Sequence, residues 1–529
     1  MVAVDDVTQA VEHLEHDLPP GLVERLLADV RAQPGADRMT TIAPFTGKPL
    51  FDLPVSTEQD VADAVAEARE AQQAWASRPV RERAEIIGRI HNVTWDRRHE
   101  LLDLLQLETG RSRFDAYLEA ASAAVKSRYL SRTAPSVLAP SRRLGVLPFA
   151  TKTQVFYQPV GVVGLITAWN FPVVFASADG FAALVAGNGV VHRPDRQSLV
   201  SSLWVRSLAI EAGVPPELWQ VLNGPGAVMG PAIVGSVDYV AFTGSTRVGR
   251  EIAEMAAPRL IRVSLELGGK NSLILLPDAP VRRAAYGAIR ATFTNAGQAC
   301  VGSERVLVPA SLHDQFVTEL RRRMRLMRLS AGFRFGYEMG SLVNQSQLEK
   351  VTAHVEDAVA KGAVVLEGGR ARPDLGPYFY EPTLLTNVRP GMMCVDEETF
   401  GPVLSVSSYH SLDEAVEMAN DTNYGLHASV WSRDTKAAEA FAQRLRVGTV
   451  EINDGYIATW GSVDTPQGGM KDSGIGRRNG PEGIIRFTEP QSVTVQRAPL
   501  LHPPPGVTQQ QFADIMAHTF KALHLAGRR

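Results

Sequence analysis

Residues 160–167 have the sequence VGVVGLIT, a short and mostly apolar run that follows Pro159. A helical pattern then extends to Ala186, a second apolar run occupies residues 189–192, and another helical pattern ends at Gly213. Short apolar strands separated by helices are what a parallel sheet covered on both faces requires. The sequence therefore predicts an α/β fold. Further apolar runs continue the series at residues 219–222, 239–243 and 273–276.

A second α/β region is predicted between residues 268 and 462. It contains strand-like apolar runs at residues 305–308 and 404–409, with helical periodicity between them at residues 348–360. Additional strand-like segments lie outside both regions, at residues 151–157 and 491–496. A chain of 529 residues is long enough for two or three domains, which fits this division.

Two helices are predicted outside these regions. Residues 56–75 have an apolar stripe at helical spacing, and Ser56 with Gln59 matches a capping box at its start. Near the C-terminus, the prolines at 503–505 precede an amphipathic tail, which we expect to pack on the protein's own surface or on a sister subunit. Membrane contact is the alternative, although the tail has few charges. The apolar tail residues are Phe512, Ile515, Met516, Phe520 and Leu523.

Charge and cysteine content exclude several classes of protein. A net charge of −3 gives no electrostatic bias toward nucleic acid or an anionic membrane. The only two cysteines, Cys300 and Cys394, cannot form a disulfide framework and fit a reducing compartment. The N-terminus lacks the basic start of a signal peptide, and no apolar run reaches the roughly 18 residues of a membrane span. We therefore expect a cytoplasmic protein without a membrane partner, a nucleic-acid partner or a metal site.

Three motifs carry residues that suit catalysis. Residues 294–300, TNAGQAC, surround Cys300 with small and polar residues, which favours a loop that exposes the thiol; a buried structural cysteine is the alternative. Glu266 lies between two leucines, where burial would raise its pKa toward that of a general base, unless it is exposed at a strand end. Asn170 follows the run at 160–167, where it would either cap a helix or donate to a developing oxyanion.

Two further motifs suit a nucleotide coenzyme. Residues 242–249, FTGSTRVG, place glycines at a strand-to-helix turn, where a helix N-terminus can bind a pyrophosphate. The spacing differs from the usual GxGxxG. Residues 397–403, EETFGPV, combine carboxylates for ribose hydroxyls with an aromatic ring for stacking, and a surface turn is the alternative.

In this order, the five motifs resemble those of the aldehyde dehydrogenase superfamily, together with a sixth at residues 468–477, GGMKDSGIGR. The resemblance spans residues 40–496, and the chain looks most similar to a bacterial branch assigned as succinate-semialdehyde dehydrogenases. It implies a Rossmann-like coenzyme domain, an α/β catalytic domain and a small β arm that pairs with a neighbour in a homodimer or homotetramer. The implied parts are an N-terminal extension at 1–39, a coenzyme domain at 40–141 and 160–266, a catalytic domain at 267–465, an arm at 142–159 and 488–499, and a C-terminal tail at 500–529.

The resemblance also implies roles for individual residues. Cys300 would attack the aldehyde carbon, and the oxyanion would be held by the Asn170 side chain and the Cys300 backbone N–H. Glu266 would activate the water that hydrolyses the thioester, with Lys270 organising the region through hydrogen bonds. NADP or NAD would accept the hydride. The residues implied at the coenzyme are Thr167, Trp169, Arg193, Arg196, Gly226, Gly244, Ser245, Gly249, Leu267, Glu398 and Phe400.

The residue at position 266 also separates reaction types. Relatives that pass the thioester to coenzyme A typically lack a Glu there, so Glu266 favours hydrolysis to the free acid. A relative without activity, serving as a binding or structural protein, is the alternative. The presence of Cys300, Asn170 and Glu266 together argues against that alternative.

Residues 192–197, HRPDRQ, bear on the choice of coenzyme. They place Arg193 and Arg196 where the family usually has the Lys and Glu that hold the adenosine ribose. Two guanidinium groups suit the 2′-phosphate of NADP, whereas a Glu would repel it, so we expect NADP to be preferred over NAD. In the alternative, Arg196 points to solvent and Asp195 binds the ribose.

The sequence leaves two candidates for the aldehyde substrate. Succinate-semialdehyde dehydrogenases bind the substrate carboxylate with arginines after the oxyanion Asn and shortly before the nucleophile. Residues 173–179 and 292–295 contain no cation in this chain. A desolvated carboxylate without a charged partner is unfavourable. The overall similarity therefore favours succinate semialdehyde, whereas these positions favour an apolar aliphatic or aromatic aldehyde.

Overall fold

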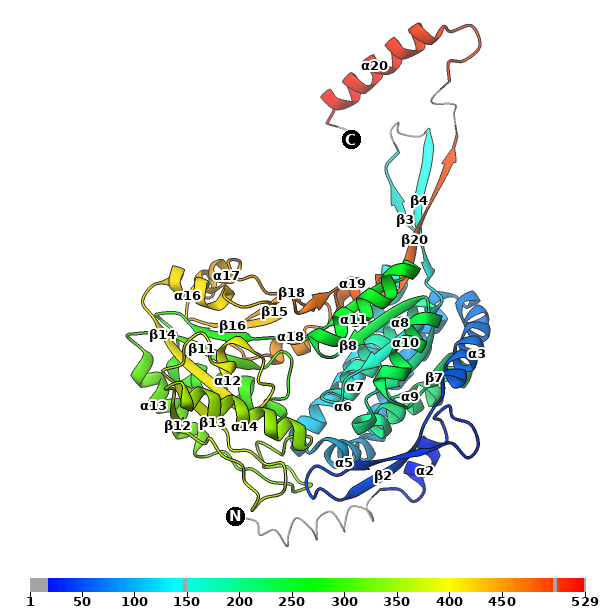
Figure 1. The fold of residues 1–529 in the computed structure, drawn as a ribbon. Helices are drawn as coiled ribbons and strands as arrows, with labels where there is room; N and C mark the ends of the chain where they lie inside the picture. Colours follow the sequence, from blue (N-terminus) through cyan, green and yellow to red (C-terminus); the bar gives the residue numbers. More distant parts are fainter. Residues whose placement is uncertain (1–17, 146–149, 498–501, 528–529) are drawn as a thin grey trace.

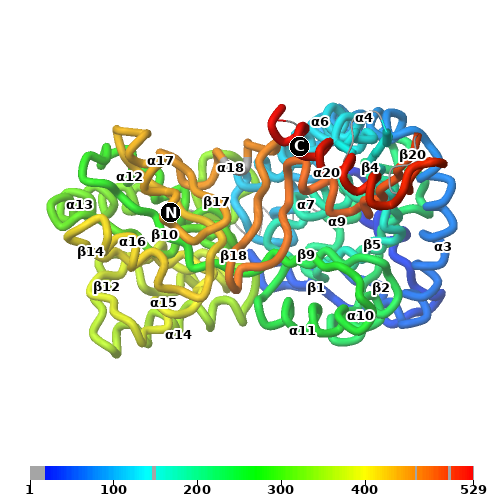
Figure 2. The backbone as a smooth tube through the Cα atoms, turned by 90° about the horizontal axis from the view of Figure 1, so that it is seen from above, coloured from blue at the N-terminus to red at the C-terminus, as the bar shows by residue number. Residues whose placement is uncertain are grey.

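The computed structural model describes residues 18–145, 150–497 and 502–527. Two α/β sheets form two lobes, which lie side by side in Figure 2, and a narrow three-stranded sheet projects from the molecule (Figure 1). The predicted fold, with two α/β regions and a β arm, is confirmed. The exact domain boundaries stay predictions, and residues 1–17 of the predicted N-terminal extension lie outside the described residues.

The first sheet is centred on the run at residues 160–167, which forms β5 (Val162–Thr167). All six residues of β5 are buried. Val163 and Leu165 belong to one core cluster, whereas Val162 and Ile166 belong to another, because alternate side chains of a strand point to opposite faces. The order across the sheet is β19 (Gly474–Ile475), β9 (Arg262–Glu266), β8 (Tyr239–Thr243), β5, β6 (Gly189–Pro194) and β7 (Trp219–Val221). All neighbouring strands are parallel except β19 and β9.

Helices bury both faces of this sheet. Residues Leu22 and Leu26, from the predicted N-terminal extension, pack into the same core as the helices that follow them. The helices of this lobe are α2 (Leu22–Leu27), α3 (Glu58–Ser77), α4 (Val80–Asp96), α5 (Arg98–Thr109), α6 (Arg113–Val137), α7 (Pro172–Phe175), α8 (Phe181–Ala186), α9 (Leu199–Ala212), α10 (Gly226–Ser236), α11 (Thr246–Ala256) and α19 (Gly480–Ile485). A hairpin of β1 (Arg38–Ile42) and β2 (Pro49–Pro54) lies beside them.

The capping box of α3 lies one residue later than predicted. Thr57 accepts a hydrogen bond from the backbone N–H of Asp60, whose carboxylate accepts one from the Thr57 N–H. The predicted cap, Ser56, is engaged elsewhere: its hydroxyl donates to the Arg31 carbonyl at 2.6 Å and accepts from the Asn223 N–H. The prediction of Ser56 and Gln59 was therefore wrong, because Ser56 joins the helix to neighbouring segments instead of capping it.

The second sheet forms the core of the other lobe. Its strands are parallel apart from the edge strand β12, which runs antiparallel to β13. Their order is β12 (Val364–Glu367), β13 (Thr383–Thr386), β14 (Val403–Tyr409), β11 (Ser303–Pro309), β10 (Asn271–Leu275), β16 (His427–Trp431) and β17 (Thr449–Ile452). The helices of this lobe are α12 (Val281–Phe293), α13 (His313–Met324), α14 (Gln345–Ala360), α15 (Met393–Asp396), α16 (Leu412–Asn420), α17 (Thr435–Ala442) and α18 (Ile457–Gly461). Two short strands, β15 (Tyr424–Gly425) and β18 (Met470–Lys471), pair with each other.

The projecting arm consists of β3 (Ser141–Arg143), β4 (Thr151–Pro159) and β20 (Thr488–Gln496), all antiparallel. The tail beyond it forms α20 (Gln509–Leu525), as the amphipathic pattern predicts. No residue of α20 is buried, so the helix does not pack on the surface of its own chain. Residues 146–149, 498–501 and 528–529 of the predicted arm and tail lie outside the described residues. Within the described ranges, no helix is both long and apolar enough to cross a membrane.

Candidate active site

A cleft of about 1080 Å³ lies where strands of the first sheet end. Thr167, Thr243 and Glu266, the last residues of β5, β8 and β9, line it. This is the edge at which parallel α/β sheets bind ligands. The second lobe contributes Cys300 to the same cleft, so residues far apart in sequence meet there. The predicted site residues that line the cleft are Thr167, Trp169, Asn170, Arg193, Gly226, Gly244, Ser245, Glu266, Leu267, Cys300, Glu398 and Phe400.

Two residues predicted at the coenzyme, Arg196 and Gly249, are absent from the lining of this cleft. Arg196 is exposed, as in the alternative in which it points to solvent. Gly249 lies inside α11, where a Cβ would come within 2.5 Å of the Leu267 side chain. The structure therefore gives Gly249 a packing role, which lets α11 approach the residue after β9.

Sequence reasoning missed several lining residues, among them Gln347 and Lys350 on α14. The helix itself is predicted by its periodicity, but a polar residue on its exposed side has no motif around it. Gln347 also supports the predicted aromatic residue, because its side-chain amide donates to the Phe400 carbonyl at 2.7 Å. A cluster of three or more metal-ligating side chains is not found in the described part of the chain.

Cys300 lies at the end of a tightly constrained loop. Asn295, Ala296 and Gly297 all have left-handed backbone conformations, with φ of 52°, 54° and 74°. A Cβ on Gly297 would come within 2.1 Å of the Gly401 carbonyl oxygen, so this close approach requires glycine. Asn271 holds the other side of the loop, donating to the Cys300 carbonyl at 2.7 Å. Cys300 as a residue is partly exposed, and burial of its thiol, together with neighbouring carboxylates, raises the pKa to about 12.

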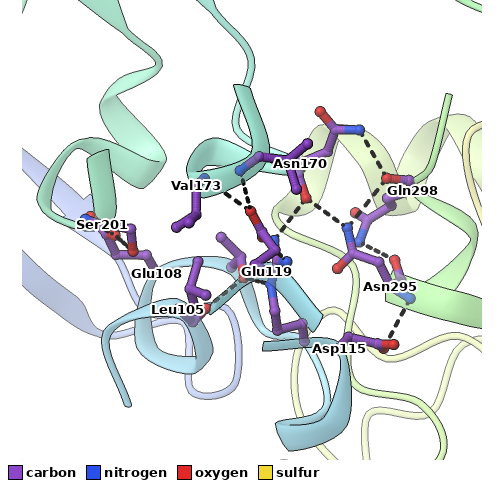
Figure 3. Close-up of polar contacts among 12 residues, drawn as sticks. Leu105, Glu108, Asp115, Glu119, Asn170, Val173, Ser201, Asn295 and Gln298 are labelled. Carbon is purple, nitrogen blue, oxygen red and sulfur yellow. Dashed lines mark hydrogen bonds and ion pairs between the residues drawn. The ribbon is translucent and has the colours of Figure 1, made fainter. Parts of the chain in front are cut away.

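Asn170 does not cap the helix that follows it. The residue before α7 is Phe171, and the first amides of that helix, those of Val173 and Val174, donate instead to Glu119 at 2.9 and 3.1 Å. The Asn170 side-chain amide donates to the Gln298 carbonyl in the nucleophile loop at 3.1 Å (Figure 3). Between the two predicted roles of Asn170, this geometry favours the one at the cleft.

A buried ion pair fixes the backbone of Asn170. Arg111 pairs with Glu119, and both side chains are almost completely buried. Arg111 also donates to the Asn170 carbonyl at 2.7 Å. Asn295 donates to the same oxygen at 3.0 Å (Figure 3). The oxygen therefore receives one donor from Arg111, just before α6, and one from Asn295 in the nucleophile loop. Together they set the position of Asn170 relative to Cys300.

Glu266 is buried, with only 7% of its surface exposed, which excludes the alternative of an exposed strand end. Burial raises its pKa to about 7, against the opposing effects of Arg478 and Arg486. Its Oε1 atom has no hydrogen-bond partner among the described residues. A carboxylate with this pKa is present in both protonation states near neutral pH, as a general base requires.

Glu398 and Phe400 form the wall opposite the first sheet. Glu398 accepts a hydrogen bond from the Gly269 N–H at 2.8 Å, and burial raises its pKa to about 7. The Phe400 ring meets Trp169 edge to face, with ring centroids 5.7 Å apart. Lys270 pairs with Glu304, which accepts from the Phe400 N–H at 2.8 Å. Lys270 is thus linked through Glu304 to the backbone of this wall, and its role in catalysis stays a prediction.

A model of the family described as "Aldehyde dehydrogenase family" matches residues 31–493. The chain belongs to the aldehyde dehydrogenase family. It is therefore an enzyme that acts on a small-molecule aldehyde, and the resemblance drawn from the six motifs is confirmed.

Three similar proteins place the chain within this family. A protein of Mycobacterium ulcerans (strain Agy99), provisionally named succinate-semialdehyde dehydrogenase (NADP(+)) 2, is 46% identical over 481 residues, which cover 91% of this chain and 92% of that protein. The crystal structure of an E. coli NADP dependent enzyme has a TM-score of 0.84 and 31% identity, covering 88% of this chain and 97% of that one. Betaine aldehyde dehydrogenase from Staphylococcus aureus in complex with NAD+ has a TM-score of 0.84 and 29% identity, covering 92% and 100%.

The position of Asn170 leads to a first prediction. Asn170→Ala should lower kcat/KM for an aldehyde by about 10²–10³-fold, the effect of removing one oxyanion donor. The free energy of unfolding should fall by less than about 1 kcal/mol, because Gln298 keeps a second donor from Asn295. Steady-state kinetics and denaturant unfolding measure the two effects.

Glu119→Gln is the matched control, because it removes the carboxylate that does cap α7. It should destabilise the protein by about 3–5 kcal/mol, since Arg111 would remain buried without its partner. A large loss of stability in Asn170→Ala, with aldehyde turnover kept, would contradict the assignment.

Proposed function

We propose that this enzyme oxidises an aldehyde to the carboxylate through a thioester on Cys300, with NADP+ preferred over NAD+. The observation that carries the proposal is the meeting of Cys300, Asn170 and Glu266 in one cleft. A thiol, an amide donor and a buried carboxylate with a pKa near neutrality supply the nucleophile, the oxyanion donor and the base that such a reaction needs.

The first step is attack of the Cys300 sulfur on the aldehyde carbon, which forms a C–S bond and an oxyanion. The Asn170 amide has two N–H groups, and one of them donates to Gln298. The second N–H, with the Cys300 backbone N–H, is the proposed donor pair for the oxyanion. Because both donors are fixed before substrate binds, they stabilise the oxyanion without reorganisation.

The cleft residues fit a dinucleotide coenzyme. The helices α10 and α11 begin beside the cleft, and Gly226, Gly244 and Ser245 line it at their N-termini. Backbone N–H groups at helix N-termini suit phosphate. Glu398 and Phe400 would hold the ribose and the flat ring. Glu398 lies so close to Gly268 that a Cβ at position 268 would come within 2.6 Å of its carboxylate. When bound, the nicotinamide supplies the hydride acceptor for the oxidation.

Glu266 is the proposed base for the last step. It removes a proton from water, the hydroxyl oxygen forms a bond to the thioester carbon, and the C–S bond breaks to release the carboxylic acid. Only the ionised carboxylate accepts this proton. The rate of hydrolysis should therefore rise with pH through about 7, the raised pKa of Glu266.

Cys300→Ala should abolish aldehyde oxidation and leave coenzyme binding intact. The cysteine forms the covalent intermediate, whereas its loop is held by Asn271 and by the close contact at Gly297. Residual activity above about a thousandth of the wild type would indicate another nucleophile. Cys394→Ala is the control: Cys394 is buried in the core of the second lobe, and this variant should stay active.

Glu266→Gln should separate the two halves of the reaction. The first turnover should proceed, giving a burst of reduced coenzyme close to one per active site, followed by a much slower steady state. Stopped-flow absorbance measures both phases. A steady-state rate equal to that of the wild type would remove Glu266 from the mechanism, and acceleration of the wild type by coenzyme A would favour acyl transfer.

We propose succinate semialdehyde as the substrate, by analogy with the mycobacterial relatives. A second candidate, an apolar aliphatic or aromatic aldehyde, is supported by the residues after Asn170. Val173 and Phe175 are buried and apolar, and the only charged residue of that segment, Asp179, is anionic and already paired.

A substrate panel decides between these candidates. If the first holds, kcat/KM for succinate semialdehyde should exceed that for hexanal and benzaldehyde by at least about tenfold, the effect of one charge-assisted contact. The reverse order would favour the apolar aldehyde. Methyl ester substrates of similar length are the matched control, because they lack the carboxylate charge.

For the coenzyme, kcat/KM should be about tenfold to a hundredfold higher with NADP+ than with NAD+. This is the selectivity that one charge-assisted pair with the 2′-phosphate would provide. Arg193 is the better placed of the two arginines, because it lines the cleft beside Gly226 and is positioned by hydrogen bonds to the Gly224 carbonyl. Arg193→Gln should therefore lower the preference more than Arg196→Gln, and Arg196→Glu should shift it toward NAD+. Equal or better efficiency of the wild type with NAD+ would contradict the proposal.

We also propose a cytoplasmic homodimer or homotetramer. The outer strand of the arm, β20, is exposed along eight of its nine residues, including Val493 and Val495 at 41% and 51%. An exposed strand with apolar side chains suits pairing with a second copy of the chain. Both cysteines are free, which suits a reducing compartment.

A further inference from the structure

A buried cluster of charges lies beside the cleft, next to Thr243 and Phe175. Its centre is Asp179, which belongs to a π-helical turn between α7 and α8 (Ala176–Gly180). Arg478 donates two hydrogen bonds to the Asp179 carboxylate, at 2.8 and 2.6 Å, and Arg486 pairs with the same carboxylate. These two guanidinium groups lower the pKa of Asp179 to about 2, in spite of its burial. All three side chains are less than 10% exposed.

Arg478 reaches from this cluster to the residues that line the cleft. Its guanidinium donates to the Thr243 hydroxyl at 2.9 Å and lies over the Phe175 ring, 5.2 Å from the ring centroid. Both Thr243 and Phe175 line the cleft with Cys300 and Glu266. In the sheet, Thr243 is also the register partner of Glu266. Arg478 therefore contacts residues that line the cleft beside Cys300 and Glu266.

The cluster has more positive than negative charge. One carboxylate, Asp179, faces two guanidinium groups, and Arg486 makes its other hydrogen bond to a neutral hydroxyl, that of Ser264. Lys126 lies close to these groups: burial, together with Arg478 and Arg486 and against the opposing effect of Asp179, lowers its pKa to about 7. Arg478 and Arg486 also oppose the rise in the pKa of Glu266, whose Oε1 lacks a hydrogen-bond partner in the described ranges.

The charged groups that act on the two reacting side chains come from several elements. Those acting on Glu266 are Arg478, Arg486, Asp179 and Arg477. Those acting on Cys300 are Glu266, Glu398 and Arg478, and Arg478 is the cation among them. The same guanidinium therefore favours the anionic form of both the carboxylate and the thiol.

We propose that Arg478, held by Asp179, is a positioning residue whose charge keeps one negative charge on the Glu266–Cys300 pair. The inference rests on the proposed function of that pair. When Cys300 is activated, its S–H bond breaks and the proton forms an O–H bond with Glu266, so the charge moves from carboxylate to thiolate while the total is unchanged. Glu266 then releases this proton to solvent before it acts as the base for hydrolysis. Arg478 does not touch substrate and acts through its two neighbours.

The test is the rate of alkylation of Cys300 by iodoacetamide as a function of pH, in the full-length protein with Cys394→Ala. This assay needs neither aldehyde nor coenzyme, so it is independent of the proposed turnover. R478Q should react about tenfold more slowly than its parent between pH 7 and 9, because loss of the nearby cation raises the pKa of the thiol. R478K keeps the charge and should stay within about twofold of the parent.

R477Q is the matched control, because Arg477 is adjacent but bonds to the carbonyls of Gly469 and Gly476. Its effect should be much smaller than that of R478Q. Equal slowing by R477Q and R478Q, equal slowing by R478K and R478Q, or a folded R478Q that reacts at the parent rate would overturn the proposal. Thermal unfolding of each variant establishes that it is folded.

E266Q provides a second measurement that leaves Arg478 in place, should R478Q fail to fold. Replacing Glu266 by the neutral Gln removes a negative charge that raises the pKa of the Cys300 thiol. E266Q should therefore be alkylated several-fold faster than the parent at pH 7–9. The rate should fall again in the E266Q/R478Q double variant. Slower alkylation in E266Q would overturn the proposal, even if aldehyde turnover follows the proposed mechanism.

Discussion

Buried carboxylates hold the residues that line the cleft, through the hydrogen bonds and ion pairs that compensate their charge. Glu119 accepts from the first amides of α7 and from Arg111, which places Asn170. Glu304 accepts from Lys270 and from the amides of the Phe400 wall. Glu266 differs, because one of its oxygens lacks a hydrogen-bond partner within the described residues. Its pKa is therefore set by burial and by the guanidinium groups of Arg478 and Arg486, and lies at about 7.

The lobes supply different parts of the chemistry. Asn170 and Glu266 come from the first lobe, and Cys300 comes from a loop of the second. Hydrogen bonds that cross between the lobes, from the Asn170 amide to the Gln298 carbonyl and from the Asn295 amide to the Asn170 carbonyl, fix the distances between these groups. Such positioning before substrate binds is what lowers the cost of reaching a charged transition state. The arm and α20 lie away from this region (Figure 1).

The sequence predicts those features that depend on local pattern. The run at 160–167 becomes the buried centre of a parallel sheet, and Cys300, Asn170 and Glu266 are each carried by a recognisable motif. Features that depend on tertiary contacts are different. Asp179 and Arg478 are 299 positions apart, and neither lies in a motif that predicts an ion pair. Likewise, Ser56 matches a capping pattern, but contacts with distant residues, Arg31 and Asn223, make Thr57 the cap instead.

The proposed mechanism requires turnover to pass through an acyl group on Cys300. Mass spectrometry of the wild-type protein, quenched in acid during turnover with NADP+ and an aldehyde, tests it most directly. An acyl intermediate should give an adduct on the peptide that contains Cys300, with the mass of the acyl group at the oxidation level of the acid. The adduct should be lost when coenzyme is omitted, since the hydride has not then been transferred. An unmodified Cys300 peptide during rapid turnover, or an acyl group found on Cys394 instead, would contradict catalysis through Cys300.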